Sequence, residues 1–451
     1  MIKKNDELEV TISELTYAGL GFVKINEFPV FIYNALPDEK VKIKILKVLK
    51  KYAFARVLEF YSLSSDRNQD LDYSYLQTGL APLSHLKYPA QLIFKQNQLK
   101  ETLHKFGINE NIEPIVASPE SMHYRNKSQI PVRSVKGQLE VGFFRSHSHH
   151  LVPTEDFLLQ EPIIDKNTIL IRDILREEQI PPYDEENQSG VIRNIMFRYG
   201  KFSKELMLVL VVNKKKIPSI SNLTAKIKAR CPEITSFIIN YNLKNTNVIL
   251  GPKNQVIFGA DYLTDKILEN TFKISPLSFY QVNPLQTENL YKIAAKFGDL
   301  KETDIVMDAY SGIGTIGNTL ANQVKQVIGV ESIPEAVEDA KENAKINQHK
   351  NIRYDLGKAE EVIDKWIEEG IKVNKIFVDP PRKGLALNFI DQSVKMQPKM
   401  IIYVSCNPAT LGRDLSLYQE RGYQIKKIQP VDMFPQTAHI ETIVLLQDAK
   451  S

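Results

Sequence analysis

One of the two cysteines in this chain stands where a nucleophile would be useful. Cys406, in the segment SCNP, follows the apolar run MIIYV and precedes a helical pattern, so its thiol should lie at the carboxyl end of a strand, near the start of a helix. We expect the helix field and a nearby cation such as Arg382 to lower the pKa of this thiol and increase the reactive thiolate. Cys231, in KARCPE, has no such setting and is predicted to be structural.

A glycine-rich segment, DAYSGIGTIG, is the second feature with chemical meaning. Its glycines, among them Gly312 and Gly314, let the backbone turn tightly and approach a ligand. The spacing also matches the dinucleotide fingerprint G-x-G-x-x-G, so an NAD(P)-dependent oxidoreductase is an alternative. Asp308, at the end of the preceding strand, favours the positively charged cofactor S-adenosyl-L-methionine over a pyrophosphate.

Two further acidic residues fit the same cofactor. Glu331 ends the next predicted strand, 19 residues after Gly312, where a carboxylate can accept hydrogen bonds from both hydroxyls of an adenosine ribose. Asp379 begins the segment DPPR, whose prolines stiffen a loop and leave carbonyls unpaired beside the reactive end of the cofactor. NAD-binding domains lack such a loop at this place. The pattern therefore predicts methyl transfer rather than hydride transfer.

A thiolate beside a methyl donor suits the methylation of uracil. Carbon 5 of uracil is too poor a nucleophile by itself, and attack of a thiolate at carbon 6 makes it nucleophilic by forming an enolate. A base must later remove the proton from carbon 5. Glu441, at the start of an apolar strand near the carboxyl terminus, is the better candidate for this base, and His439 is the alternative.

These residues require a parallel sheet to bring them together. From about residue 283, the apolar runs DIVMDAY, QVIGVE, IRYDLG, KIFVDPP and MIIYVSC each precede a helical pattern. Such alternation predicts a doubly wound α/β sheet whose ligands lie at the carboxyl ends of the strands. We therefore assign residues 271–451 to a Rossmann-like class I methyltransferase domain.

Two other domains are expected before it, because single cores rarely exceed roughly 250–300 residues. Residues 1–60 contain short strands separated by glycine and Pro-Asp turns, which predicts a small OB-like β-barrel. Residues 61–270 contain a helical pattern from about residue 90 and then alternating strands to about residue 270, which predicts a central α+β domain.

Basic residues in these two domains favour RNA as the partner. Between positions 40 and 56 there are seven basic residues and no acidic ones, with Tyr52 and Phe54 among them, as in a groove for single-stranded nucleic acid. Further clusters of basic, histidine and aromatic residues lie at 123–133, 142–150, 193–204 and 214–216. A solvated surface is the alternative for each cluster. The candidate RNA contacts are Arg125, Asn126, Lys127, Phe144, Arg145, Arg193 and Arg382.

Composition excludes several other classes of protein. No uncharged apolar run approaches the roughly 18 residues of a membrane span, so we expect a cytoplasmic protein. We also expect it to be a monomer. Two cysteines cannot form a disulfide framework or hold an iron–sulfur cluster. His147, His149 and His150 have no acidic or cysteine ligand beside them, so we expect no metal site.

Taken together, QVNP, DAYSGIGTIG, DPPRKG, VSCNPATLGRD and HIET resemble the RNA uracil-5-methyltransferase family, and the resemblance covers nearly the whole chain. It implies that Cys406 is the nucleophile and Glu441 the proton acceptor. The barrel resembles a TRAM domain, which ribosomal RNA members of the family carry and the tRNA enzyme lacks, so the resemblance favours 23S ribosomal RNA as substrate. The implied contacts to S-adenosyl-L-methionine are Gln281, Tyr310, Glu331 and Asp379.

The chain departs from many ribosomal RNA members in one respect. Those members carry four cysteines for a [4Fe–4S] cluster, and the corresponding segment here, DRNQDLDYSYLQTGLAPLSHLKY, contains none. The chain therefore resembles the cluster-free branch of Gram-positive bacteria, some of whose members modify two ribosomal RNA sites.

Three alternatives stay open within RNA biology. The first is a tRNA uracil-5-methyltransferase. The second is a methyltransferase for exocyclic amino groups, against which Arg382 counts, because such enzymes often carry an aromatic residue there. The third is a non-catalytic ribosome assembly factor, against which the intact Cys406 and Glu441 count.

Overall fold

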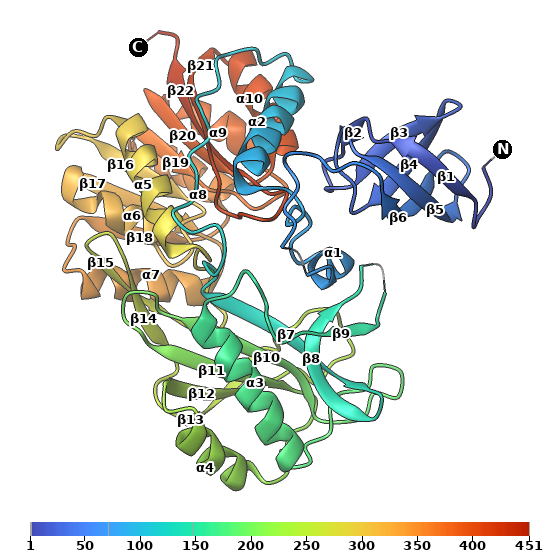
Figure 1. Ribbon diagram of the computed structural model, residues 1–451. Coiled ribbons are helices and arrows are strands. Elements are labelled where there is room, and N and C mark those ends of the chain that lie inside the picture. The colour runs from blue at the N-terminus through green and yellow to red at the C-terminus, as the bar shows by residue number, and fades with distance from the viewer. Residues whose placement is uncertain (1, 71, 147, 451) are drawn as a thin grey trace. The chain divides into compact units, whose positions relative to one another are not determined.

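The computed structural model describes residues 2–70, 72–146 and 148–450 (Figure 1). Its internal contacts divide the chain into two units. The first contains the chain up to Gln98, together with Phe144–Val152 and Phe434–His439; the second contains Leu99–Phe143, Pro153–Met433 and the chain from Ile440. His147 lies outside the described residues. The three domain ranges expected from the sequence stay predictions.

Six short strands of the first unit form one sheet. They are β1 (Glu7–Thr11), β2 (Glu14–Leu15), β3 (Gly21–Ile25), β4 (Phe28–Tyr33), β5 (Lys40–Val48) and β6 (Ala53–Phe60). They pair in the order β1-β5-β6-β4-β3-β2 and curl into a small barrel (Figure 1). Alternate side chains of β5, namely Val41, Ile43 and Ile45, are fully buried in its core, because successive side chains of a strand point to opposite faces. The predicted amino-terminal barrel is confirmed.

The first unit also holds a segment from near the end of the chain, Phe434–His439. The backbone N–H of Gln436 donates to Oε1 of Gln91 (2.9 Å), and Nε2 of Gln91 donates to Oε1 of Gln436 (2.8 Å). The backbone N–H of Leu83 donates to the carbonyl of Gln436 (2.9 Å). Both glutamines are buried, so these bonds fasten the segment firmly within its unit.

A second sheet lies in the second unit. Its strands include β7 (Lys127–Val135), β8 (Gln138–Phe144), β10 (Ile192–Tyr199), β11 (Leu206–Val212), β12 (Ile234–Tyr241) and β13 (Lys253–Phe258), in the order β13-β12-β11-β10-β7-β8. Helices α3 (Pro162–Glu177) and α4 (Ile220–Arg230) bury their apolar side chains against it. β11 and β12 are parallel, so both end at the same end of this sheet. The predicted central α+β fold is confirmed.

The third sheet carries the candidate site. Its strands are β16 (Ile305–Ala309), β17 (Gln326–Glu331), β18 (Ile352–Leu356), β19 (Lys375–Val378), β20 (Met400–Ser405), β21 (Tyr423–Val431) and β22 (Glu441–Asp448). They pair in the order β18-β17-β16-β19-β20-β22-β21. The first five are parallel, and β22 is inserted antiparallel to β20. The direction of strand order reverses between β16 and β19, where α/β sheets bind ligands.

Helices cover this sheet in two groups of neighbours. The first group is α5 (Pro284–Gly298), α6 (Thr315–Leu320) and α7 (Pro334–Ile346), and the second is α8 (Ala359–Glu368), α9 (Leu387–Lys395) and α10 (Pro408–Glu420). Trp366, Phe389 and Leu411 of the second group are buried in one core with the strands. Oδ1 of Asn283 accepts a hydrogen bond from the N–H of Gln286 (3.3 Å) and so caps α5, as the Asn-Pro pair predicts. The predicted Rossmann-like fold is confirmed.

The remaining described elements are short or connect the sheets. They are α1 (Ser74–Thr78), α2 (Tyr88–His104), β9 (Leu151–Pro153), β14 (Leu263–Ile267), β15 (Asn270–Ile274) and the 3-10 helix Ala321–Gln323. None of the helices in the described part of the chain is both long enough and apolar enough to cross a membrane.

Candidate active site

Three strand ends bring the predicted catalytic residues to one edge of the α/β sheet. β20 and β22 are antiparallel, with Ser405 opposite Thr442, so the next pair outward is Cys406 and Glu441. β19 runs parallel to β20 on its other side, and Asp379 directly follows β19. Facing residues of neighbouring strands lie roughly 5 Å apart. A thiol and two carboxyls therefore share one edge of the sheet.

The Glu441 carboxyl is buried and has an unusually high pKa. It is 4% exposed, and its Oε2 has no hydrogen-bond partner among the described residues. Burial raises the pKa well above its usual range, the neighbouring Asp379 raises it further, and Arg382 lowers it. Burial also raises the pKa of Asp379 to about 7. The Glu441 carboxyl therefore holds its proton more tightly than an exposed glutamate does.

The Cys406 thiol has a raised pKa, which corrects the expectation from the sequence. Burial raises this pKa to about 11, and the carboxyls of Glu441 and Asp379 act in the same direction. Arg382 and a backbone hydrogen bond lower it, but by less. The prediction of a lowered pKa is wrong because it counted the helix and the arginine but not the carboxyls that β19 and β22 bring to the thiol. Cys231 is 1% exposed and lies in the core of the central sheet, which fits a structural residue.

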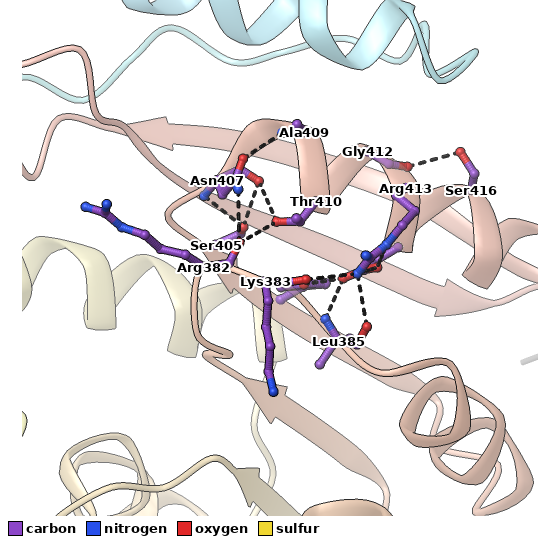
Figure 2. Close-up of polar contacts among 12 residues, drawn as sticks. Arg382, Lys383, Leu385, Ser405, Asn407, Ala409, Thr410, Gly412, Arg413 and Ser416 are labelled. Carbon is purple, nitrogen blue, oxygen red and sulfur yellow. Dashed lines mark hydrogen bonds and ion pairs between the residues drawn. The ribbon is translucent and has the colours of Figure 1, made fainter.

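Figure 2 shows how the loop after β19 is fastened to the start of α10. Nδ2 of Asn407 donates to the carbonyl of Arg382 (3.0 Å), and Oγ1 of Thr410 donates to the same carbonyl (3.3 Å). Oδ1 of Asn407 also accepts from the N–H of Ala409 (3.1 Å), so this side chain caps α10. Asn407 directly follows Cys406. One side chain thus fixes the helix start, the strand end that bears the thiol and the Arg382 loop, a role that the sequence analysis missed.

A second set of hydrogen bonds holds the same loop beyond Arg382 (Figure 2). Nη2 of Arg413 donates to the carbonyls of Lys383 (3.2 Å) and Leu385 (3.0 Å). Gly384, between them, has a φ of +73°, and a Cβ there would lie 2.6 Å from Oδ2 of Asp414. Only glycine fits this turn. The backbone of the loop is therefore fixed, whereas Arg382 itself is exposed.

The glycine-rich segment makes a tight turn between β16 and α6. Gly314 has a φ of +80°, and a Cβ there would lie 2.3 Å from the hydroxyl of Tyr354. Tyr310 has a φ of +62°, in the left-handed region that bulky residues rarely adopt. The N–H of Gly312 donates to Oε2 of Glu331 (3.1 Å), which ties the turn to the end of β17. Tyr310, Gly312 and Gly314, all predicted to contact the cofactor, therefore lie in this turn, and Glu331, also predicted to do so, is bonded to it.

Polar atoms of this turn suit a positively charged adenosyl cofactor. Asp308 is 1% exposed; its Oδ2 accepts from the N–H of Gly317 (2.8 Å), while its Oδ1 has no partner among the residues described. Oγ of Ser311 and Oδ1 of Asn318 are likewise buried without partners in the described part of the chain. Burial raises the pKa of Asp308 to about 7. A nearby positive charge would stabilise its ionised form, whereas a pyrophosphate would be repelled by it.

Asn126, predicted to contact RNA, is buried and supports the cofactor edge. Its N–H donates to the carbonyl of Val282 (2.9 Å), and its Nδ2 donates to the carbonyl of Gln281 (3.2 Å). Nε2 of Gln281 in turn donates to Oδ2 of Asp379 (3.4 Å). Asn126 is 4% exposed, so its amide serves to position Gln281.

Arg125 and Lys127 lie beside a third cation that the sequence analysis did not single out. Arg198 of β10 is opposite Lys127 of β7 and is 3% exposed. Nε of Arg125 donates to the carbonyl of Lys127 (2.9 Å). Burial and then the charges of Arg198 and Arg125 lower the pKa of Lys127 to about 7. An arriving anion would relieve this repulsion between like charges.

Arg193 is turned into the protein. It is 6% exposed, and its guanidinium donates to the carbonyls of Asn242 (3.1 Å), Lys244 (2.7 Å) and Thr246 (3.0 Å). Its donors are used within the protein, so the structure does not support the predicted RNA contact through this side chain. Arg193 shapes the loop after β12 instead.

Phe144 and Arg145 belong to the first unit. The ring of Phe144 lies 6.1 Å from that of His149, and the exposed Arg145 donates its N–H to the carbonyl of His150 (2.9 Å). Their contact with RNA stays a prediction. Within the ranges that the structure describes, no group of three or more His, Cys, Asp or Glu side chains is placed to hold a metal ion.

Comparisons with known proteins identify relatives along the whole chain. The family described as tRNA (Uracil-5-)-methyltransferase matches residues 87–449, and the TRAM domain matches residues 3–58. A Streptococcus pyogenes serotype M1 protein named an uncharacterized RNA methyltransferase is 48% identical over 448 residues, which are 99% of this chain and 97% of that protein. A Lactobacillus johnsonii protein of the same name is 47% identical over 447 residues, which are 99% of each chain.

A solved structure has the same fold. The Pyrococcus abyssi tRNA (uracil-54, C5)-methyltransferase, in complex with S-adenosyl-L-homocysteine, is similar with a TM-score of 0.79 and 25% sequence identity. The match covers 97% of this chain and 100% of that one. The family resemblance and the fold class read from the sequence are both confirmed.

The first prediction concerns Arg382, whose positive charge lowers the pKa of Cys406 and of Glu441. The substitution Arg382→Met should reduce the fraction of Cys406 that is present as thiolate. Alkylation of Cys406 by iodoacetamide at pH 9, measured by peptide mass spectrometry, should then be several-fold slower. Lys383→Met is the matched control, because it removes the same charge from the adjacent exposed position. Equal rates for the two variants would contradict a specific action of Arg382.

Proposed function

Because the chain belongs to the tRNA (uracil-5-)-methyltransferase family, we propose that it transfers a methyl group from S-adenosyl-L-methionine to carbon 5 of a uridine in 23S ribosomal RNA. The observation that carries this proposal is the pairing of Cys406 with Glu441 at adjoining strand ends, beside Asp379. A thiol and a base on one sheet edge are the two groups that covalent activation of uracil requires.

The cofactor supplies a methyl group on a positively charged sulfur, which becomes a neutral thioether when the methyl group leaves. Asp308 and Asp379 are the residues that would face its positive charge, and Glu331 is the residue that would accept hydrogen bonds from its ribose. Gln281 and Tyr310 complete the set that we propose to hold it, with Gly312 and Gly314 keeping the backbone close.

Cys406 acts as the nucleophile. Its thiol loses a proton, its sulfur bonds to carbon 6 of uracil, and the electron pair of the C5–C6 double bond moves into an enolate that ends at O4. A pKa of about 11 means that few thiols are ionised at neutral pH, so the attack needs a proton acceptor. Asp379, with a pKa of about 7, is partly ionised at that pH and is the acceptor we favour.

Glu441 acts as the base of the last step. Once carbon 5 bears both a methyl group and a hydrogen, the Glu441 carboxylate takes that proton, the C5–C6 double bond re-forms and the bond from carbon 6 to sulfur breaks. The raised pKa makes this carboxylate a stronger proton acceptor than an exposed glutamate. Arg382, which lowers the pKa, favours the ionised form that the step requires.

Two groups of residues, one basic and one aromatic, suit contacts with RNA. Near the cofactor edge, a phosphate of the substrate would stabilise the charged form of Lys127, whose pKa is lowered by burial and by the charges of Arg198 and Arg125. In the barrel, Phe31 and Phe54 are cross-strand neighbours whose ring centroids lie 5.8 Å apart, and they are partly exposed. Such rings suit the stacking of unpaired bases.

Two classes of RNA fit the chain. The barrel favoured ribosomal RNA because the tRNA enzyme was expected to lack one, yet the Pyrococcus abyssi tRNA enzyme aligns with 97% of this chain, most of the barrel included. A tRNA substrate is therefore the second candidate. We further expect the enzyme to act as a monomer in the cytoplasm.

The test of the substrate is to map 5-methyluridine in 23S ribosomal RNA and in tRNA from a strain that lacks this gene. We expect one or two uridines of 23S ribosomal RNA to lose the methyl group while tRNA is unchanged. Loss confined to tRNA would replace ribosomal RNA by tRNA in the proposal. An unchanged pattern in both RNAs, in a strain without a second enzyme of the family, would refute it.

Replacing Cys406→Ala should abolish 5-methyluridine formation and leave binding of S-adenosyl-L-methionine unchanged, because alanine keeps the fold but cannot attack carbon 6. Cofactor binding is measured by calorimetry and methylation by nucleoside mass spectrometry. Cys231→Ala, at the buried cysteine in the core of the central sheet, is the control for the loss of a thiol. Turnover near that of the wild type in Cys406→Ala would exclude the covalent mechanism and favour an exocyclic-amine methyltransferase.

Replacing Glu441→Gln should let methyl transfer proceed and slow the release of product, because the amide cannot take the proton from carbon 5. A covalent protein–RNA adduct should then accumulate on a denaturing gel. His439→Gln serves as the comparison, since His439 is the alternative base. An adduct that appears with His439→Gln but not with Glu441→Gln would reverse the assignment.

A further inference from the structure

A cavity of about 610 Å³ lies in the second unit, and the mechanism uses none of its residues. Three exposed lysines from different segments line it: Lys215 follows β11, Lys244 follows β12 and Lys253 begins β13. None of the described residues that line it is acidic. The positive charge of the cavity is therefore not balanced from within it.

The loop that forms one wall of the cavity is held in a fixed shape. Arg193 binds the carbonyls of residues 242, 244 and 246, which leaves the Lys244 side chain exposed. Nδ2 of Asn242 donates to the carbonyls of Val248 and Ile249 (3.0 Å to the latter). A wall fixed in advance loses little conformational freedom when a ligand binds.

A second set of hydrogen bonds constrains the same loop where it leads into β13. Nδ2 of Asn240 donates to the carbonyl of Gly251 (2.8 Å), and Oδ1 of Asn240 accepts from the Gly251 N–H (2.7 Å). A Cβ at position 251 would lie 1.9 Å from the carbonyl oxygen of Tyr241, so only glycine permits this closure. The sequence analysis noted the lysines at 214–216 but had no means of joining them to Lys244 and Lys253.

The lining combines charge with groups that recognise a nucleotide. The amides of Asn254 and Gln255 and the phenol of Tyr241, which bonds to Gln255, lie among the lysines. Lysines neutralise backbone phosphates, and amide and hydroxyl groups bond to sugar and phosphate oxygens. The volume is within the roughly 300–1,000 Å³ of ordinary ligand sites.

The cavity is remote from the reacting groups. The central sheet is tied to the cofactor edge at the Arg198 end of β10, where Arg198 donates to the carbonyls of Pro276 and Ser278. The cavity lies at the other end, where Arg193 is placed five residues earlier on the same strand. At about 3.3 Å per residue, roughly 17 Å of strand separates the two ends.

We propose that this cavity, lined by Lys215, Lys244 and Lys253, binds the sugar–phosphate backbone of the substrate RNA at a place remote from the target uridine. The inference rests on the proposed function, because it assumes an RNA substrate. It adds that substrate affinity depends on nucleotides well outside the methylated position, and that this contact does not take part in the chemical step.

The experiment compares the triple variant Lys215→Gln, Lys244→Gln, Lys253→Gln with the wild type on 23S ribosomal RNA transcribed in vitro, with S-adenosyl-L-homocysteine present. We expect at least tenfold weaker binding at about 0.1 M salt, and a salt slope of log affinity smaller by about one for each lysine. In a separate assay with S-adenosyl-L-methionine in place of S-adenosyl-L-homocysteine, the KM for methylation should rise while kcat stays the same. A short RNA limited to the nucleotides around the target should bind both proteins equally.

A matched control separates local contact from overall charge. Lys166→Gln, Lys292→Gln, Lys365→Gln also removes three exposed lysines, which pair with glutamates in other parts of the second unit. Equal weakening by the two triple variants, or equal weakening for the short and the long RNA, would overturn the inference. Failure of the proposed function is distinguishable, since the wild type would then form no 5-methyluridine whatever its affinity for RNA.

Discussion

The active edge depends on one electrostatic constraint: a half-buried thiol and two carboxyls, one of them buried, share the same end of the sheet. In such a place one negative charge makes the next one more costly, so Cys406, Asp379 and Glu441 titrate as a set. In the proposed reaction, the attack of the thiol and the release of the methylated uracil each transfer a proton to one of these groups. The same crowding that holds Cys406 as a thiol would make Glu441 the strong base that the proposed reaction requires. Arg382 is the cation that acts on both, which explains why the loop bearing it is fastened at so many points.

A positively charged ligand would be stabilised at this edge, because its aspartates can supply negative charge. Asp308 lies on β16, the strand next to β19. Burial raises its pKa to about 7, as it does for Asp379, and its Oδ1 has no hydrogen-bond partner among the described residues. A positively charged cofactor would allow both aspartates to ionise, and an ionised Asp379 can then receive the thiol proton. Binding of the cofactor would then promote ionisation of the Cys406 thiol through the charge of Asp379. This coupling would require no movement of the backbone.

Local patterns gave much of this from the sequence. Strand and helix alternation identified the α/β sheet, and the segments SCNP, DPPR and DAYSGIGTIG identified its functional end, because each is a turn whose residue types are dictated by short-range geometry. The sign of the Cys406 pKa shift was beyond reach, since it depends on β22 being inserted beside β20, a pairing between segments that no local pattern specifies. The position of the Arg193 side chain was beyond reach for the same reason. The sequence does not show whether a guanidinium faces solvent or, as here, bonds to three backbone carbonyls.

The path of the chain around Glu441 has a consequence for modular engineering of this fold. The chain leaves the second unit after Met433 and re-enters it at Ile440, one residue before Glu441, and the intervening segment is bonded to Leu83 and Gln91. The barrel-bearing unit is thus not an appendage that can be cut off at a single linker. A deletion of residues 1–98 would remove the partners of that segment and leave it unsupported next to Glu441, the proposed base. Exchange of whole barrels between relatives would have to carry this short carboxyl-terminal segment along with its partners.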